Sequence, residues 1–303
     1  MIFPPGRVSW KAGSILLLSV ALLAASDTMN EIRRGDFARH APAPTELKVL
    51  DWNIDRGTQL EKIASGLTSQ QPDLAILQEV DLNARRSGSQ DVAQELAKRL
   101  SLNYVFATEF QELGQSSSGE PAYHGQAILT SLPIRSSRAL RFENQSAFWK
   151  PRPYLPKWGL FQRRLGGRLA LIAELEYPGG VLVVYDLHLE SRSAGAIQYE
   201  QLKEVLADAD RYPKGTPIVI AGDLNTKYRH SQTTIVQELI QRGYEDGFGG
   251  RNERTHFFIG SVDYIFVRGP IRIADTKVHR NIHGSDHYAI SARLVSTPQA
   301  ARR

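Results

Sequence analysis

Clusters of polar residues follow, or open, several apolar stretches that have the composition of buried strands. Ile220-Ala221 leads into Gly222-Asp223-Leu224-Asn225, Val262-Asp263 opens the stretch Tyr264–Val267, and Gly284-Ser285-Asp286-His287 lies further along the chain. Carboxylate, amide and imidazole groups are costly to bury unless they have partners. They are common where a metal ion assists chemistry at phosphate. The sequence therefore predicts a functional site at these strand ends.

Six such positions carry an ordered set of side chains. The order is amide, carboxylate, imidazole, carboxylate with amide, carboxylate, and carboxylate with imidazole: Asn53, Glu79, His188, Asp223 with Asn225, Asp263, and Asp286 with His287. A phosphodiester is an anion that repels a nucleophile, and a hard divalent cation with oxygen ligands relieves this repulsion. Glu79 and Asp286 are the natural ligands for Mg²⁺ or Mn²⁺, with Asn53 beside them.

The remaining residues can orient the attacking water and transfer protons. Asp223 can serve as the base, and Asn225 lies two residues on, on the same face of an extended segment. An imidazole at His287 or His188 can stabilise the phosphorus oxygens or protonate the leaving group. Asp263 can hold His287 in the correct tautomer and raise its pKa.

The hydrophobic pattern predicts the elements that position these residues. Strands are expected over 47–54, 74–77, 104–107, 127–129, 169–175, 181–189, 217–221, 262–267, 271–279 and 288–294. Helices are expected around 60–67, 92–100, 194–210 and 235–242. Two series of strands, each with interposed helices, predict an α/β sandwich with sheets inside and helices outside.

The six blocks together resemble the endonuclease/exonuclease/phosphatase superfamily. It includes pancreatic-type deoxyribonucleases, abasic-site endonucleases, inositol-polyphosphate 5-phosphatases and neutral sphingomyelinases. The resemblance runs from about residue 47 to 295 and is carried by Asp51-Trp52-Asn53, Leu77-Gln78-Glu79, Asp186-Leu187-His188-Leu189, Gly222-Asp223-Leu224-Asn225, Val262-Asp263-Tyr264 and Gly284-Ser285-Asp286-His287.

What the resemblance implies is a four-layer α/β sandwich with two central mixed sheets, divalent-metal dependence and hydrolysis of a P–O bond. It makes Glu79 the main metal ligand, with Asn53 and Asp286 close by, and gives the other five residues roles at water and phosphate. Two positions depart from the family pattern. Asp186 stands where an amide is frequent, so a second metal ion or repulsion of substrate is an open interpretation, and Gln126 replaces a usual Asn. His188 argues against the abasic-site branch.

Composition and the chain ends limit the other possibilities. The 303 residues contain no cysteine, which excludes disulfides, thiolate nucleophiles and cysteine metal sites. Residues 1–26 read as an export signal or N-terminal anchor, with Arg7 and Lys11 before an apolar run and small residues after it. Residues 27–46 read as a linker, 47–296 as the catalytic domain and 297–303 as a basic tail. We expect the protein to be periplasmic or secreted, or to be anchored in a membrane through residues 12–25.

A basic, aromatic segment is the expected contact to substrate. Residues 135–168 hold nine basic side chains and one acid, a charge of +8, whereas the whole chain carries +5. Candidate substrate contacts are Arg163, Arg164, Arg168, Trp149 and Trp158. Three interpretations remain open: the segment binds DNA phosphates and bases, it lies at an anionic membrane interface, or its aromatic residues cover a sheet edge.

The expected function is that of an exported, metal-dependent endonuclease that acts on DNA as a monomer. The alternative is a lipid phosphodiesterase or phosphatase at a membrane surface, similar to sphingomyelinases or phosphoinositide phosphatases. A third possibility is a binding protein on the same scaffold without turnover. Taken singly, each polar residue could also be a turn former or a helix or strand cap.

Overall fold

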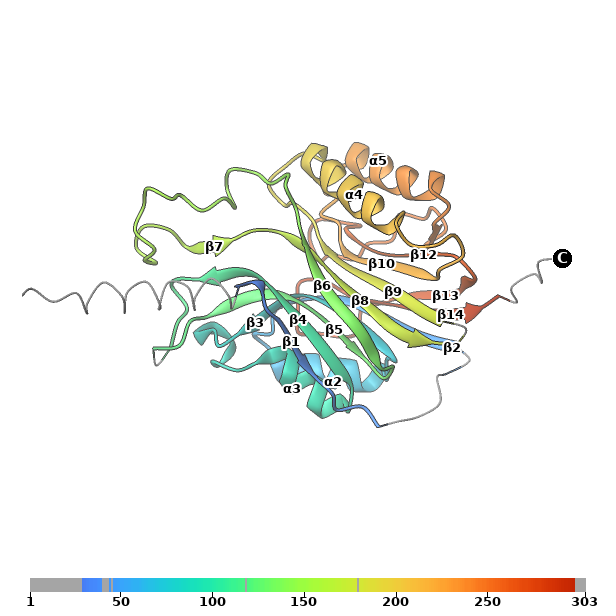
Figure 1. Cartoon of the computed structure of the whole chain (residues 1–303), viewed down its shortest axis with the longest axis horizontal. Coiled ribbons are helices and arrows are strands. Elements are labelled where there is room, and N and C mark those ends of the chain that lie inside the picture. Colours follow the sequence, from blue (N-terminus) through green and yellow to red (C-terminus); the bar gives the residue numbers. More distant parts are fainter. Residues whose placement is uncertain (1–28, 40–43, 45, 118, 179, 298–303) are drawn as a thin grey trace, which may run out of the picture.

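Two β-sheets pack face to face, and helices cover the outer face of each sheet (Figure 1). The computed structural model describes residues 29–39, 44, 46–117, 119–178 and 180–297. Both sheets mix parallel and antiparallel pairs: β2 is parallel to β3, and β9 is parallel to β10. The predicted four-layer α/β sandwich is confirmed.

The first sheet has eight strands. Its order is β1 (Ile32–Gly35), β4 (Asn103–Glu112), β5 (Tyr123–Thr130), β3 (Leu74–Leu82), β2 (Glu46–Arg56), β14 (Ala289–Ser296) and β13 (Ile271–His279), and β7 (Arg164–Gly166) also pairs with β4. Helices α2 (Leu60–Gln70) and α3 (Val92–Leu100) cover its outer face, and a 3₁₀ turn, η1, spans Arg85–Ser87.

The second sheet has six strands. Its order is β11 (Glu245–Asp246), β12 (Asp263–Arg268), β10 (Ile218–Asp223), β9 (Gly180–His188), β8 (Leu169–Tyr177) and β6 (Ile134–Arg141). Helices α4 (Ala196–Ala209) and α5 (Arg229–Gln241) cover its outer face. The helix expected around 235–242 therefore begins earlier than its apolar residues suggest, because its first turns are polar.

The alternation of side chains along β2 explains why polar groups lie between the two sheets. In β2, Leu47 and Val49 belong to the core between the sheets, whereas Leu50 and Trp52 pack beneath the helices. Because side chains alternate along a strand, Asp51 and Asn53 continue the inner face. The apolar core of the sandwich therefore ends in polar side chains at this end of the sheets.

The segment 27–46 is not wholly a linker. Residues 32–35 form β1 and pair antiparallel with β4, from Ile32 opposite Ala107 to Gly35 opposite Tyr104. The sequence Ile-Arg-Arg-Gly has no apolar alternation. An edge strand does not need one, because backbone hydrogen bonds hold it and it has no two buried faces.

The predicted export signal or anchor lies outside the described residues, as does almost all of the predicted basic tail. Among the residues that the structure describes, no helix combines the length and apolar composition needed to span a membrane.

Candidate active site

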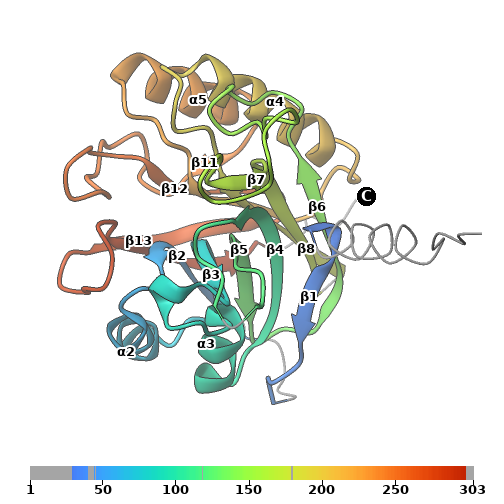
Figure 2. The same ribbon diagram turned by 90° about the vertical axis from the view of Figure 1, so that its left-hand side faces the viewer.

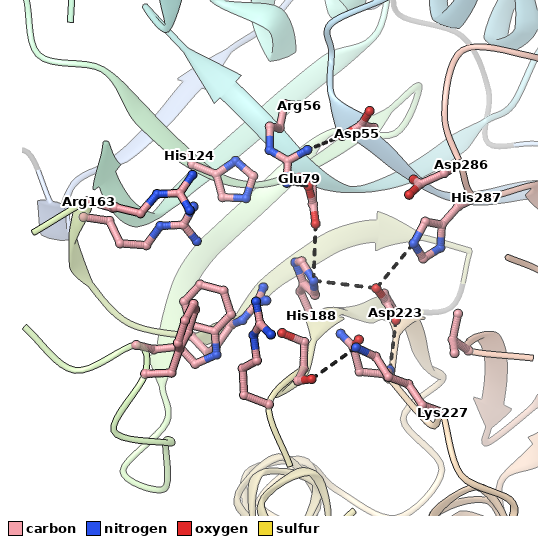
Figure 3. A pocket seen from close by; sticks show the side chains of 18 of the residues that line it. Asp55, Arg56, Glu79, His124, Arg163, His188, Asp223, Lys227, Asp286 and His287 are labelled. Carbon is pink, nitrogen blue, oxygen red and sulfur yellow. Dashed lines mark hydrogen bonds and ion pairs between the residues drawn. The ribbon is translucent and has the colours of Figure 1, made fainter. Parts of the chain in front are cut away.

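A cavity of about 500 Å³ opens where the inner strands of both sheets end (Figure 3). Six of the eight predicted catalytic and metal-binding residues line it: Glu79, His188, Asp223, Asn225, Asp286 and His287. The other two, Asn53 and Asp263, are buried directly behind the lining and touch it through hydrogen bonds. The structure therefore brings the whole predicted set together.

Asp263 and His287 form a tight, buried pair. His287 Nδ1 lies 2.9 Å from Oδ1 and 3.0 Å from Oδ2 of Asp263. Burial, the largest single cause, acts to lower the pKa of His287. The charge and hydrogen bond of Asp263, together with the charges of Asp223 and Asp286, outweigh it and raise that pKa to about 10. The imidazole is therefore a cation at neutral pH, with its other nitrogen, Nε2, 3.8 Å from Asp223 Oδ2.

Asp223 occupies the centre of the site because of sheet register. It stands opposite His188 in the parallel pair β9–β10 and opposite Asp263 in the antiparallel pair β10–β12. Its Oδ2 lies 3.6 Å from His188 Nε2 and accepts a hydrogen bond of 3.3 Å from the Asn53 amide. Burial is the main cause that raises the pKa of Asp223 to about 6. A carboxylate with that pKa is suited to accept a proton near neutral pH.

Asn225 is held by hydrogen bonds to Asp223 and Leu189. Its own N–H donates to Asp223 Oδ1 at 2.9 Å, and its side-chain amide donates to the Leu189 carbonyl at 3.0 Å. Its φ of 51° lies in the left-handed region that Asn tolerates better than most residues. The turn after β10 therefore fixes the Asn225 side chain at the cavity wall.

Glu79 reaches the cavity through an irregularity in β3. The pairing of β3 with β5 shifts register between Leu77 and Val80, and Glu79 has a φ of 52°. Such a bulge changes the direction in which a side chain points. The Glu79 carboxylate lies 3.1 Å from Arg56 Nη2 and 4.0 Å from His188 Nε2. Burial acts to raise the pKa of Glu79, but nearby cations, Arg56 first, bring it below its ordinary value.

Asp286 is the more exposed of the predicted metal ligands. Its carboxylate lies 3.5 Å from His256 Nε2, and this hydrogen bond is the largest cause that lowers the pKa of Asp286 to about 2. His256 Nδ1 accepts hydrogen bonds from two backbone N–H groups, Phe258 at 2.9 Å and Ile259 at 3.2 Å. His256 Nε2 therefore carries the proton, and His256, which also lines the cavity, is a residue of the site.

The donor set fits a hard divalent cation. Glu79 and Asp286 are both ionised at neutral pH, and both line the cavity. Asn53, 1% exposed, lies behind them. Oxygen donors with net negative charge are the ligands that Mg²⁺ and Mn²⁺ take in proteins. Two close groups of potential ligands occur among the described residues, His256–Asp286–His287 and Asp223–Asp263–His287. Neither contains Glu79, whose carboxylate contacts Arg56 instead.

Glu109 is a site residue that sequence reasoning missed. It is fully buried, and its Oε2 lies 3.7 Å from His188 Nδ1. Arg168 Nη1 binds the same carboxylate at 3.2 Å. Burial dominates the lowering of the His188 pKa well below its ordinary value, so this imidazole is neutral. The only sequence signal was a carboxylate two residues beyond the apolar run 104–107.

Asp186 has a structural place beneath the site. Its Oδ1 and Asp51 Oδ1 both accept hydrogen bonds from the Gln78 amide, at 2.9 and 2.8 Å. Burial raises the pKa of both carboxyls well above the ordinary value, which favours their neutral forms. Asp186 does not line the cavity. The structure therefore does not favour Asp186 as a second metal ligand or as a charge that repels substrate.

The basic segment divides into buried and free cations. Arg168 is bound to Glu109, and Arg164 Nη2 lies 2.7 Å from Glu112. Both guanidinium groups lie against the Trp149 ring, whose Nε1 donates to Glu190 at 2.6 Å. Arg163 lines the cavity, and among the described residues it has no carboxylate partner. Trp158 is 69% exposed and does not line the cavity.

Other cavity residues complete a wall of positive charge. The side chains that line the cavity without a carboxylate partner among the described residues are Lys150, Arg152, Arg163, Arg192 and Lys227. His124, beside Arg163 in Figure 3, also lines the cavity, with its Nδ1 2.9 Å from the buried Asp81. Asp55, which contacts Arg56, lies at the edge. The cavity therefore offers several cations to an anionic ligand.

Several solved structures share this fold. An endonuclease/exonuclease/phosphatase from Beutenbergia cavernae superposes with a TM-score of 0.63 at 22% identity, over 84% of this chain and 72% of that one. A humanized D. rerio TDP2 gives 0.57 at 19% identity, over 84% and 100%. A truncated Caenorhabditis elegans TDP2 gives 0.55 at 21% identity, over 83% and 98%.

Sequence comparison gives the family. A UPF0294 protein of Vibrio vulnificus is 28% identical over 120 residues, which span 38% of this chain and 37% of that protein. The model of the Endonuclease/Exonuclease/phosphatase family matches residues 52–287, from the Trp52 beside Asn53 to His287. Members of this family are hydrolases of phosphate esters and generally depend on a divalent metal ion. This chain belongs to the Endonuclease/Exonuclease/phosphatase family.

Proposed function

We propose that this protein is an Mg²⁺- or Mn²⁺-dependent phosphodiesterase whose reaction takes place in the cavity around Asp223. The observation that carries the proposal is the contact of Asp223 Oδ2 with both imidazoles, 3.6 Å from His188 and 3.8 Å from His287. A base (Asp223), a neutral imidazole (His188) and an imidazolium (His287) therefore lie together, so this site can both accept a proton from water and donate one to a leaving group. A wall of unpaired cations beside them attracts an anionic substrate.

The chain's own residues account for the proton movements. Asp223 takes a proton from water as the water oxygen attacks phosphorus, and Asn225 orients that water. The His287 imidazolium stabilises the charge on the phosphorus oxygens, and a proton from an imidazole passes to the leaving oxygen as its bond to phosphorus breaks. Glu79 and Asp286, with Asn53, would hold the divalent cation, which supplies further charge neutralisation at the phosphate.

DNA is the first substrate class that we propose. Cations with no carboxylate partner bind backbone phosphates, and aromatic side chains at the cavity, Phe148 and Phe161, offer faces on which bases stack. On this view the protein nicks plasmid DNA when Mg²⁺ is added. Phospholipid is the second substrate class, and large apolar side chains exposed around the cavity mouth favour it.

A panel assay separates these activities. Purified protein is incubated with DNA, RNA, sphingomyelin vesicles and inositol phosphates, with and without a chelator, and Glu79→Gln protein serves as the inactive control. Metal-dependent cleavage of DNA that Glu79→Gln abolishes supports the nuclease proposal. Release of phosphocholine or phosphate from vesicles, with DNA left intact, supports the lipid proposal. No hydrolysis of any substrate with either cation overturns the proposed function.

An exported location and a monomeric state remain proposals as well. The apolar run in residues 15–25, preceded by Arg7 and Lys11, supports export or anchoring. Fractionation of cells that express the full chain, together with gel filtration of the purified protein, tests both.

A further inference from the structure

Large apolar side chains are exposed in two segments that flank the cavity mouth. Segment 142–163, between β6 and β7, extends beyond the sheets (Figure 1), and segment 247–262 connects β11 to β12. We call their exposed apolar residues the apolar rim. It consists of Phe148, Tyr154, Trp158, Leu160, Phe161, Phe257, Phe258 and Ile259. Leu160 and Phe258 are 87% and 77% exposed, values typical of polar surface residues.

Both segments of the apolar rim belong to one side of the molecule. Phe148 and Phe161 from the first segment and Ile259 from the second line the same cavity. The second segment is also tied to the site, because the Phe257 N–H donates to the Asp286 carbonyl at 2.8 Å. Figure 2 looks toward the side on which the β6–β7 segment projects. A planar partner that contacts the rim therefore faces the cavity mouth.

The charge of this side complements an anionic partner. Residues 144–173 contain no Asp or Glu and six basic side chains. Lys150, Arg152, Lys157 and Arg163 are exposed and have no carboxylate partner among the described residues. Three prolines, at 151, 153 and 156, restrict the backbone between them. The rim thus presents apolar side chains and cations on a stiff segment.

This combination distinguishes a membrane from a nucleic acid. Aliphatic Leu160 and Ile259 have no ring to stack on bases, and protein–DNA interfaces are typically polar. Exposed apolar side chains gathered around a cavity mouth are typical of a binding surface. Trp, Tyr and Phe beside Lys and Arg are typical of segments that lie at the headgroup level of anionic bilayers.

We propose that the apolar rim inserts into the interface of an anionic phospholipid bilayer and places the cavity mouth over the lipid headgroups. The inference rests on the proposed function for the chemistry and deepens it: of the two substrate classes proposed above, the rim favours the second, the phosphodiester of a phospholipid headgroup. Docking itself requires no hydrolysis. It can therefore be measured on protein that is held inactive.

Trp158 in the rim provides a local probe. Of the four tryptophans, Trp52 and Trp149 are buried, and Trp10 is removed by a Trp10→Phe substitution that serves as the background. Full-length protein with Glu79→Gln in addition is mixed with phosphatidylglycerol vesicles whose acyl chains carry bromine. We expect bromine to quench Trp158, and the quenching to disappear in the matched Trp158→Phe protein. Vesicles of phosphatidylcholine alone are expected to quench it less.

A second pair of variants tests the rim without altering the probe. Leu160→Ser with Phe258→Ser removes two rim side chains, and Ile240→Ser removes an exposed apolar side chain of α5 that lies outside the rim. The double variant is expected to need about tenfold more lipid for half-maximal quenching of Trp158, whereas Ile240→Ser leaves the curve unchanged. If residues 1–26 hold the protein on the vesicles, the double variant is instead expected to lower the maximal quenching, because the quenching reports the position of Trp158.

Three results overturn the proposal. Trp158 stays unquenched on anionic vesicles, or the double variant and Ile240→Ser behave alike, or single-stranded DNA protects Trp158 from a soluble quencher while vesicles do not. The last result assigns the rim to nucleic acid. Failure of the docking leaves phosphodiester hydrolysis in the panel assay intact, whereas failure of the proposed function leaves the quenching intact, so the two failures are distinguishable.

Discussion

The Nδ1 atom of His287 lies 2.9 Å from Oδ1 of Asp263, and both residues are buried. Twenty-three residues lie between them in the sequence. Asp263 opens β12 in one sheet, His287 precedes β14 in the other, and the packing of the two sheets brings the side chains together. The carboxylate fixes the orientation of the imidazole and keeps it charged. This relationship makes His287 a cation aimed at the same point as Asp223.

Replacement of Asp263 by Asn is expected to lower kcat by about 10²-fold or more, with little change in KM. The amide cannot stabilise the imidazolium, and general acid–base groups contribute on this scale. Steady-state kinetics on the substrate found in the panel assay measure the change. Asp210→Asn is the matched control, because Asp210 binds Arg242 and Arg268 at the surface away from the cavity. Equal kinetics for Asp263→Asn and wild type would remove the pair from the reaction.

The Asp263–His287 pair is also expected to stabilise the fold in a pH-dependent way. The folded-state pKa of His287 is raised from 6.5 to about 10, so its contribution is complete below pH 6.5 and is lost as the pH rises through 10. The difference in unfolding free energy between wild type and His287→Gln should therefore narrow from pH 6.5 to pH 10. Urea unfolding in the presence of a chelator measures it. A difference that widens over this range contradicts the assignment.

Catalytic activity is expected to fall as the pH drops below 6. Asp223 must be ionised to accept a proton, and its pKa is raised to about 6. The decline of kcat/KM should approach about tenfold per pH unit on the acid side. A profile from pH 4.5 to 8, measured below substrate saturation, checks this. An activity that is flat down to pH 4.5 rules out Asp223 as the base.

Arg168 and Arg163 are expected to behave differently although both come from the basic segment. Arg168→Ala leaves the buried Glu109 without its partner, and loss of one member of a buried pair typically destabilises by about 3–5 kcal/mol. Arg163→Ala removes an exposed, unpaired cation and should leave stability unchanged. It should instead weaken the binding of an anionic substrate and flatten its salt dependence. Thermal unfolding and binding at several salt concentrations test both, and the opposite pattern refutes the division.

The sequence predicted the fold class and the members of the site because these follow from local patterns. Apolar runs such as 74–77 and 181–189 indicate buried strands, and a carboxylate or imidazole at the end of such a run indicates a site residue. The metal ion and the precise ligand set were not accessible in this way. The Arg56–Glu79 contact, for example, depends on a bulge in β3, and no residue type in that strand predicts the bulge.

Other residues were missed because their roles depend on tertiary contacts. Glu109 is one of many acids in the chain, and only the approach of β4 to β9 places it beside His188. His256 lies in an irregular loop, and its role depends on a bridge to His287. β1 was read as part of a linker because an edge strand needs no apolar alternation.

The most direct test of the central claim is the hydrolysis of a small chromogenic phosphodiester, bis(p-nitrophenyl) phosphate, which depends on the site and not on the rim. Rates are measured with Mg²⁺ or Mn²⁺, with a chelator, and for Glu79→Gln, Asp223→Asn and His287→Gln. We predict metal-dependent release of p-nitrophenol by the wild type and a loss of about 10²-fold or more in each variant. Turnover that survives chelation, or that all three variants retain, would contradict the account.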